Sequence, residues 1–367
     1  MKNSYWLYAA MIIVLVAGHG FAQESESEKT TSIDASTARS VDVDTSKFNT
    51  REKRLQTQPL DWEATRGTVT EVPATEPEVR APDMGEPGSI PGQAPAEEAD
   101  DRAREAFPED WQGLEESQGE STSSGSMRSV DFGTQDIFAQ YCENCPSVNL
   151  NYPQKAVGKL FTNSGSCSAS VISGKNIIVT AAHCCYNRSN NSWIGGWSFA
   201  PAYRDGYAPY GTFPWSSARI LNRWISHGDR RSDVCLISLG KNANGKDVTY
   251  YTGWLGRSWN WPSTQVHHAI GYPGNIGSGN KMELCVSESF SPGGGCGGTT
   301  VLNTGCSMTY GASGGPWIRS YRNINWVNSV VSGYDSGSCT GSFGQTFNGP
   351  RFTTDNIVTL CTDHGCD

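Results

Sequence analysis

The stretch Thr309-Tyr310-Gly311-Ala312-Ser313-Gly314-Gly315-Pro316-Trp317 surrounds one serine with three glycines and is then broken by a proline. A serine hydroxyl is a poor nucleophile unless a base removes its proton and backbone N–H groups receive the charge that develops on the attacked carbonyl. Flanking glycines let a substrate and the backbone approach that hydroxyl closely. Because the same pattern is also ordinary loop composition, its interpretation depends on what the other segments of the chain offer.

Two further segments offer the partners that such a serine needs. Ile178-Val179-Thr180-Ala181-Ala182-His183-Cys184 runs from a β-branched run through small residues into a histidine. Ser232-Asp233-Val234-Cys235-Leu236-Ile237-Ser238-Leu239 places an aspartate at the start of an apolar strand, where a buried carboxylate needs a partner such as a histidine N–H. The alternatives are a hydrogen-bonded structural histidine and a simple strand-edge aspartate.

Short β-branched runs dominate the half of the chain that holds these segments. They lie at 170–172, 176–180, 234–239 and 329–332 and are separated by Gly, Asn, Asp and Ser. Helical periodicity is suggested only at 354–361. This pattern predicts an all-β barrel or sandwich domain.

The order His183, Asp233, Ser313, together with the motifs around these residues, resembles that of the chymotrypsin-like serine proteases, and the resemblance covers most of 129–367. It implies an all-β fold of two six-stranded β-barrels with a cleft between them. A closer resemblance is to the secreted glutamyl endopeptidase-like branch found in microbes. The segments that carry it are 156–161, 197–203, 271–274 and 306–308.

The resemblance also implies a role for each residue of the site. Ser313 Oγ attacks the scissile carbonyl, His183 takes the proton and returns it to the leaving amine, and Asp233 fixes the histidine tautomer. The N–H groups of Gly311 and Ser313 form the oxyanion hole. Neither a metal nor a cofactor is expected.

Specificity is expected to come from four positions that match the family's substrate-binding wall. Ser307 lies at the base of the pocket, and its uncharged side chain argues against selection of Arg or Lys by a buried carboxylate. Ser332, Gly333 and Tyr334 are expected to offer backbone groups to an extended peptide. Two departures stand out: Ala312 replaces the aspartate of trypsin-type enzymes, and 330–334 lacks the histidine with which glutamyl endopeptidases bind an acidic side chain.

All 12 cysteines lie between Cys142 and Cys366, so 129–367 is called the cysteine-rich half. In a chain with an export signal, an even cysteine count indicates disulfides, although the spacing of Cys142 and Cys145 also fits a redox or zinc motif. The resemblance implies Cys167–Cys184 and, in the closer branch, Cys285–Cys306. We further expect Cys185–Cys235, since each of these cysteines lies two residues beyond His183 or Asp233.

The start of the chain has the pattern of a secretion signal. A lysine precedes an apolar run at 5–16, and the small residues at 20–22 predict cleavage after Ala22. The alternative is a membrane anchor, but the run is short for a bilayer and is followed by Gly18, His19 and Gly20. We therefore expect a secreted protein without a stable membrane anchor.

Residues 23–128, called the acidic segment, differ sharply in composition from the rest. They contain 24 acidic and 11 basic residues, no cysteine and four aromatic residues, which predicts a largely disordered segment. It is either a solvated linker or a propeptide that covers a binding cleft. We favour a propeptide because a flexible, exposed junction ends at Arg128, and proteases cut at junctions of this kind. Cleavage there would leave 129–367 as the protease domain.

Two rival functions remain open. The Gly-x-Ser-x-Gly pattern also fits an esterase that would use Asp335 or Asp355 with His364. A protease-like binding protein without activity is the other rival. The favoured function is a monomeric endopeptidase with polypeptide substrates and its own propeptide as inhibitor, and a net charge of +3 on the cysteine-rich half gives no reason to expect nucleic-acid binding.

Overall fold

The computed structural model describes residues 30–39, 41–67, 85–119, 138–142, 150–291, 301–336 and 345–367. The expected signal sequence at 1–22, the Arg128 junction and Cys145 lie outside these residues. Among the described residues, no helix is both long and apolar enough to cross a bilayer.

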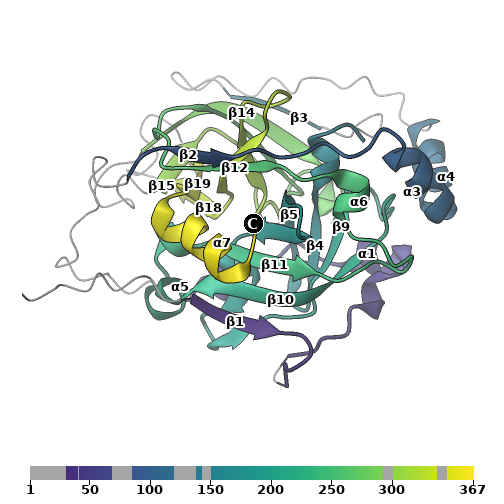
Figure 1. Ribbon diagram of the computed structural model, residues 1–367, viewed down its shortest axis with the longest axis horizontal. Helices are drawn as coiled ribbons and strands as arrows, with labels where there is room; N and C mark the ends of the chain where they lie inside the picture. The colour runs from purple at the N-terminus through teal and green to yellow at the C-terminus, as the bar shows by residue number, and fades with distance from the viewer. Residues whose placement is uncertain are drawn as a thin grey trace, which may run out of the picture.

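Six antiparallel strands close the first barrel (Figure 1). They are β4 (Val157–Thr162), β5 (Gly165–Ser173), β6 (Ile177–Thr180), β9 (Ser198–Pro201), β10 (Phe213–Leu221) and β11 (Cys235–Leu239). Their order is β10-β11-β6-β5-β4-β9, and the ring closes because β10 also pairs with β9. Every residue of β4 and β6 is buried, so both faces of these strands are covered.

The second barrel follows in the chain and is built the same way. Its strands are β13 (Val266–Gly271), β14 (Glu283–Phe290), β15 (Val301–Thr304), β16 (Pro316–Arg319), β17 (Trp326–Val330), β18 (Gly333–Ser336) and β19 (Gln345–Pro350). β17 leads directly into β18, and this long strand pairs with β16 at its start and with β19 at its end. Pairings β16–β13–β14–β15–β19 complete the ring. The predicted fold of two six-stranded barrels is confirmed.

Shorter elements surround the barrels. They are β3 (Ala139–Cys142) on β14, β12 (Gly256–Trp259) parallel to β17, the hairpin β7 (Tyr186–Asn187) with β8 (Ser192–Trp193), α5 (Asn222–His227) and α6 (Thr249–Thr252). A helical turn, Thr354–Val358, runs into α7 (Thr359–His364), where helical periodicity is expected from the sequence.

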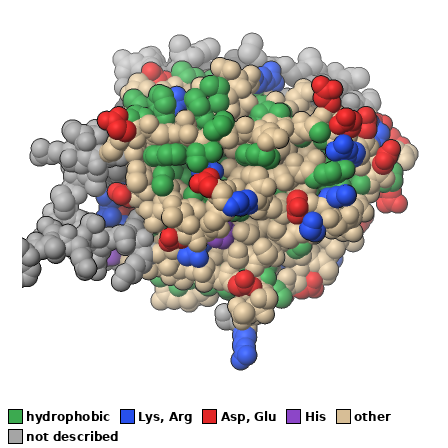
Figure 2. All heavy atoms as spheres, in the orientation of Figure 1, with side chains coloured by type: hydrophobic (Ala, Val, Ile, Leu, Met, Phe, Trp, Pro, Cys, Tyr) green, Lys and Arg blue, Asp and Glu red, His purple; other side chains and the backbone are tan. Residues whose placement is uncertain are grey.

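The acidic segment contributes strands and helices of its own. They are β1 (Thr30–Asp34), α1 (Arg51–Gln56), α2 (Trp62–Arg66), β2 (Gly88–Ile90), α3 (Ala99–Ala106) and α4 (Pro108–Gly119). β1 pairs with β10 of the first barrel, whereas β2 pairs with β12, so the segment adds a strand to each of the two large sheets (Figure 1). Acidic side chains are prominent on the α3–α4 end of the molecule (Figure 2).

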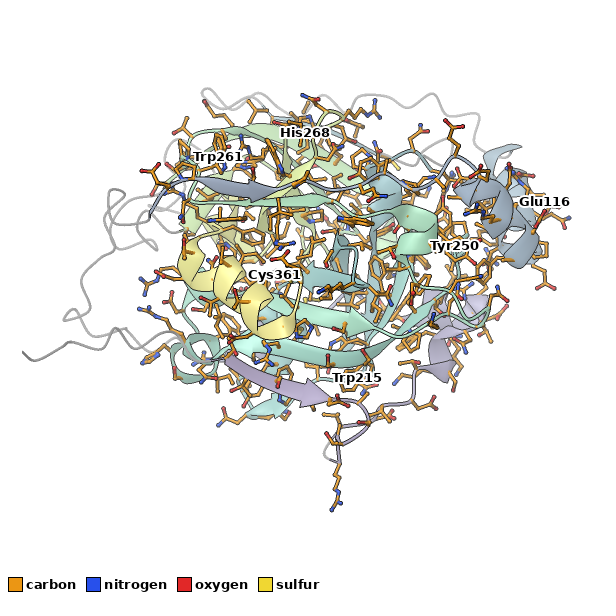
Figure 3. All side chains as sticks on the ribbon, viewed as in Figure 1. Glu116, Trp215, Tyr250, Trp261, His268 and Cys361 are labelled. Carbon is orange, nitrogen blue, oxygen red and sulfur yellow. A yellow bond between two sulfur atoms is a disulfide. The ribbon has the colours of Figure 1, made fainter. Side chains whose placement is uncertain are left out.

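The expectation of disorder therefore does not hold for residues 30–39, 41–67 and 85–119. The physical reason is that the few aromatic side chains of the acidic segment pack on the cysteine-rich half instead of on one another. Ring centroids are separated by 5.1 Å for Phe48 and Phe161, 6.1 Å for Phe107 and Tyr251, and 6.1 Å for Trp111 and Tyr210. Arg102 of α3 also lies 5.0 Å from the ring of Tyr250, on the α6 side of the molecule (Figure 3).

Candidate active site

Strand pairing in the first barrel brings His183 and Asp233 together. In the antiparallel register of β6 and β11, Thr180 is opposite Cys235. The residues that follow Thr180 and those that precede Cys235 therefore meet at the same end of the two strands. A short 3-10 turn, Ala182–Cys184, then directs the His183 side chain toward the carboxylate.

Asp233 holds the histidine through two hydrogen bonds and accepts a third from Ser332. Its Oδ1 accepts from the backbone N–H of His183 at 2.9 Å, and its Oδ2 lies 2.8 Å from His183 Nδ1. The hydroxyl of Ser332 donates to the same Oδ2 at 2.5 Å. Since an ionised carboxylate only accepts, these bonds place a proton on Nδ1, and in that tautomer Nε2 is the nitrogen that can accept a proton.

Ser313 reaches this site from the loop between β15 and β16. Its carbonyl oxygen accepts from the N–H of Ser168 on β5 at 2.7 Å, which ties the serine loop to the first barrel. The same carbonyl lies 3.8 Å from Sγ of Cys184, next to His183. His183 Nε2 is buried and has no hydrogen-bond partner among the described residues, so the link to the Ser313 hydroxyl is not formed in this structure. Such bonds are often long before a substrate binds.

Gly311 adopts a backbone conformation that suits it to the predicted oxyanion hole. Its φ is +89°, and a Cβ built there would lie 2.6 Å from the carbonyl oxygen of Tyr272, so a side chain would be strained and crowded. Among the described residues, neither Gly311 N–H nor Ser313 N–H donates a hydrogen bond. Two unengaged donors on one turn are what a developing oxyanion requires.

The expected substrate wall lies along the end of the second barrel. β18, which holds Gly333 and Tyr334, is the terminal strand of its sheet, so only one of its edges is paired among the described residues. The hydroxyl of Tyr334 lies 2.9 Å from that of Tyr310, and this bond raises the pKa of Tyr310. Tyr334 thus connects β18 to the loop that carries Ser313. Its position in the sequence does not reveal this contact.

Ser307 has a partner that the sequence analysis misses. Oε1 of Gln140, on β3, accepts from the hydroxyl of Ser307 at 2.6 Å and from its N–H at 3.2 Å. β3 reaches this place by pairing with β14, with Gln140 opposite Cys285. The base of the expected pocket is therefore polar and uncharged, and an amide from the start of the cysteine-rich half contributes to it.

The acidic segment enters the site through residues that no motif singles out. Leu60 N–H donates to the carbonyl of Ser166 and Ser166 N–H donates to that of Gln58, both at 2.8 Å, so the segment pairs with the start of β5. Between them, Pro59 lies against Gly311, because a Cβ built on that glycine would be 2.9 Å from the Pro59 Cβ. Residues 58–60 therefore cover the turn that carries the two donors.

Lys159 is a buried cation beside this part of the cleft. Its Nζ donates to Asn280 Oδ1 at 3.1 Å and lies 4.8 Å from the ring of Tyr203. Burial lowers the pKa of Lys159 to about 7, and nearby Asp205 partly offsets the effect. The sequence around Lys159 does not predict that this lysine is buried, although every residue of β4 is.

Each of the expected disulfide pairs occurs in the structure. Cys167 is joined to Cys184, Cys185 to Cys235, and Cys285 to Cys306; Cys361 and Cys366, left unassigned from the sequence, form a further disulfide. The sulfurs of Cys167 and Cys184 lie close enough to His183 to suggest a metal site. Because they are bonded to each other, they offer no thiolate for a metal.

Comparisons with known proteins point in the same direction as this geometry. No family model matches the chain. A glutamyl endopeptidase of Bacillus licheniformis is 28% identical over 143 residues, which cover 38% of this chain but only 44% of that relative. Among solved structures, the protease Anisep from Arthrobacter nicotinovorans has a TM-score of 0.51 at 25% identity and covers 59% of this chain and 98% of its own.

A second solved structure supports the fold alone. The thermostable serine protease AL20 from an extremophilic microorganism has a TM-score of 0.51 at 24% identity over 58% of this chain and 97% of its own. The part of the chain that these structures cover is close in size to the cysteine-rich half. The chain is therefore a homologue of the chymotrypsin-like serine proteases, related to the glutamyl endopeptidase branch.

Proposed function

We propose that the protein is a secreted serine endopeptidase that is made as a precursor. The observation that carries this proposal is the buried network in which Asp233 binds both the backbone and Nδ1 of His183 and also accepts from Ser332. A merely structural histidine needs no such fixed tautomer. The network keeps Nε2 as a base toward the loop that holds Ser313.

In the proposed mechanism, Ser313 Oγ attacks the carbonyl carbon of the scissile peptide bond while His183 Nε2 takes its proton. The N–H groups of Gly311 and Ser313 bind the resulting oxyanion, and the imidazolium is stabilised by Asp233. His183 then returns the proton to the leaving amine, and an acyl-enzyme on Ser313 remains. Water, activated by the same imidazole, hydrolyses that ester and restores the serine.

The precursor is proposed to consist of a signal sequence at 1–22, an inhibitory acidic segment at 23–128 and a protease domain at 129–367. Support for inhibition comes from Pro59 beside Gly311 and from the pairing of residues 58–60 with Ser166. In this proposal Pro59, which lies against Gly311, hinders the approach of a peptide substrate to the turn that carries the oxyanion donors. Removal of the acidic segment after the chain has folded is thus the proposed activating step.

The test is hydrolysis of peptides by the processed protein and its variants. Ser313→Ala and His183→Ala are each expected to lower the rate about 10⁴-fold or more. A fluorophosphonate probe should label the processed protein and fail to label Ser313→Ala. Comparable turnover by either variant contradicts the mechanism, and absence of labelling favours a binding protein without activity.

The same assay separates the protease from the esterase. His364 hydrogen bonds through Nε2 to Ser238 Oγ, on β11, at 2.9 Å. His364→Ala is therefore the matched control and should retain activity. An esterase that used His364 would show the opposite result, with activity lost in His364→Ala and kept in His183→Ala.

A further inference from the structure

Trp62, at the start of α2, is enclosed by residues of the candidate active site. Its side chain belongs to the acidic segment, yet the residue is only 6% exposed. The indole lies edge-on to the imidazole of His183, with ring centroids 6.4 Å apart, and edge-on to Tyr334 at 6.1 Å. Edge-to-face contacts of this kind are favourable for aromatic rings beyond the area they bury.

Gly333 provides the room for this indole. A Cβ built on Gly333 would lie 3.2 Å from Cε2 and 3.3 Å from Cδ2 of Trp62. Those distances are tighter than nine in ten real Cβ contacts, so even a methyl group at 333 would force the indole to shift by a few tenths of an ångström. The glycine thus forms a flat backbone surface on which one ring can rest.

Further aromatic side chains surround this surface. Trp224, on α5, is fully buried and lies 6.4 Å from the His183 ring, so it supports the imidazole. Tyr310 bonds to the hydroxyl of Tyr334 and keeps that ring in place. We use the name aromatic subsite for the surface formed by His183, Gly333 and Tyr334, the three residues that contact the indole of Trp62.

We propose that the aromatic subsite selects a bulky aromatic side chain in the substrate, on the amino side of the bond that is cleaved, and that Trp62 occupies this subsite in the precursor. The inference rests on the proposed function, because a substrate must extend along β18 past His183. Gly333 and Tyr334 are then specificity-determining residues.

The chemistry of the surface favours an aromatic ring over other side chains. A small side chain would leave the backbone of Gly333 uncovered and would lose the packing contacts that the indole makes. A carboxylate would lose its hydration against the rings of Tyr334 and His183. The indole of Trp62 already occupies the subsite, and it therefore indicates that the preferred substrate side chain is aromatic.

The first test measures cleavage. The full chain is folded intact and then cut at a site-specific protease sequence placed between Ser121 and Ser126. Peptides that differ only in one residue on the amino side of the cut are compared at each position in turn. At one of these positions Trp should exceed Ala in kcat/KM by about tenfold or more, the size of discrimination that an apolar pocket provides.

Gly333→Ala should lower that ratio, because its Cβ would crowd the ring that rests on the glycine. Gly174→Ala is the matched control. Gly174 lies on the turn between β5 and β6, and a Cβ built on it would also lie 3.2 Å from tryptophan carbons, in this case those of Trp254. This control should keep the ratio of the unmodified protein. If Gly333→Ala does not fold, Tyr334→Ala should lower the ratio in the same direction.

The second test measures binding without catalysis. The same peptides are titrated against the cut Ser313→Ala protein, in which the chemical step is blocked. Tighter binding of the Trp peptide by about tenfold supports the subsite even if no peptide is ever cleaved. Equal affinities for the Trp and Ala peptides at every position overturn the subsite, whereas failure of cleavage and of fluorophosphonate labelling overturns only the proposed function.

Discussion

The cysteine-rich half and the acidic segment are ordered in different ways. The first encloses two barrels and is crosslinked by disulfides, such as Cys185–Cys235, whose cysteines are 50 residues apart. The second has no cysteine, and its strands and helices lie on the surface of the first. The cysteine-rich half buries its own side chains, whereas the acidic segment buries its aromatic side chains on the surface of the cysteine-rich half. The two should therefore respond differently to substitution, cutting and pH.

The largest expected difference concerns release of the acidic segment from the cleft. Cutting the folded chain near Arg128 should raise peptide hydrolysis by about 10²-fold, because a tethered occupant competes at an effective concentration in the millimolar range. Trp62→Ala should raise the activity of the uncut chain in the same direction. Initial rates on one fluorogenic peptide measure both effects.

Phe107→Ala is the control for that experiment. Phe107 packs on Tyr251 rather than in the cleft, so its removal weakens docking without opening the site. Equal rates for the cut and uncut proteins would mean that the acidic segment is a passive linker.

The next prediction compares two disulfides within the cysteine-rich half. Replacing Cys185 and Cys235 by alanine should lower the free energy of unfolding by about 2–4 kcal/mol, because the bridge closes a long loop. The pair Cys361 and Cys366, separated by 5 residues, should cost less when replaced. Urea unfolding of the cut protein measures both losses, and a larger loss for the shorter loop would contradict the loop-length explanation.

The third prediction concerns pH and the second barrel. Burial, with Arg319 and His268 nearby, lowers the pKa of His267 on β13 from 6.5 to about 3. The folded protein therefore binds fewer protons than the unfolded chain between these values, and stability falls as the pH drops below 6.5. The expected slope from this residue approaches 1.4 kcal/mol per pH unit.

His267→Phe should reduce that slope in unfolding experiments between pH 6 and 4.5. His364, whose pKa burial lowers to about 4, contributes in the same direction, so the slope decreases without vanishing. His227→Gln at the end of α5 is the control and should keep the original slope. An unchanged slope in His267→Phe would show that the imidazole is not the group that titrates.

The sequence predicts the two barrels well because short local patterns identify their strands. The segments around His183 and Asp233 are β-branched strands that end in polar residues, and antiparallel pairing alone places the two side chains together. Composition underestimates the order of the acidic segment because it considers only the apolar side chains within that segment. Phe48, Phe107 and Trp111 instead use the surface of the cysteine-rich half, which composition does not measure.

Contacts across the cleft escape prediction for a related reason. Pro59 beside Gly311 and Trp62 on Gly333 join residues more than two hundred positions apart, with no motif on the acidic side. Gly333 itself reads as an ordinary strand residue until the indole that rests on it is seen. Such close approaches depend on side-chain shape, and neither periodicity nor spacing carries that information.

The smallest expected effect tests whether charge or packing holds α3 in place. Lys155 Nζ and the hydroxyl of Tyr210 both donate to Asp100 Oδ1, each at 2.7 Å. Asp100→Asn keeps an acceptor for Tyr210 but removes the charge that pairs with Lys155. Affinity of the cut acidic segment for the cysteine-rich half should fall by about 1 kcal/mol, or roughly fivefold, in calorimetric titration.

Asp101→Asn is the matched substitution one residue along the same helix. The Asp101 side chain is 78% exposed and pairs only with Arg104 of α3 among the described residues, so its loss should leave the affinity unchanged. If both variants bind alike, the ion pair contributes nothing measurable and α3 is held by ring packing. A deficit in Asp100→Asn that shrinks in high salt would instead assign this part of the docking to charge, because the Asp100 side chain is 36% exposed and its ion pair is partly screened, whereas contacts between buried rings are not.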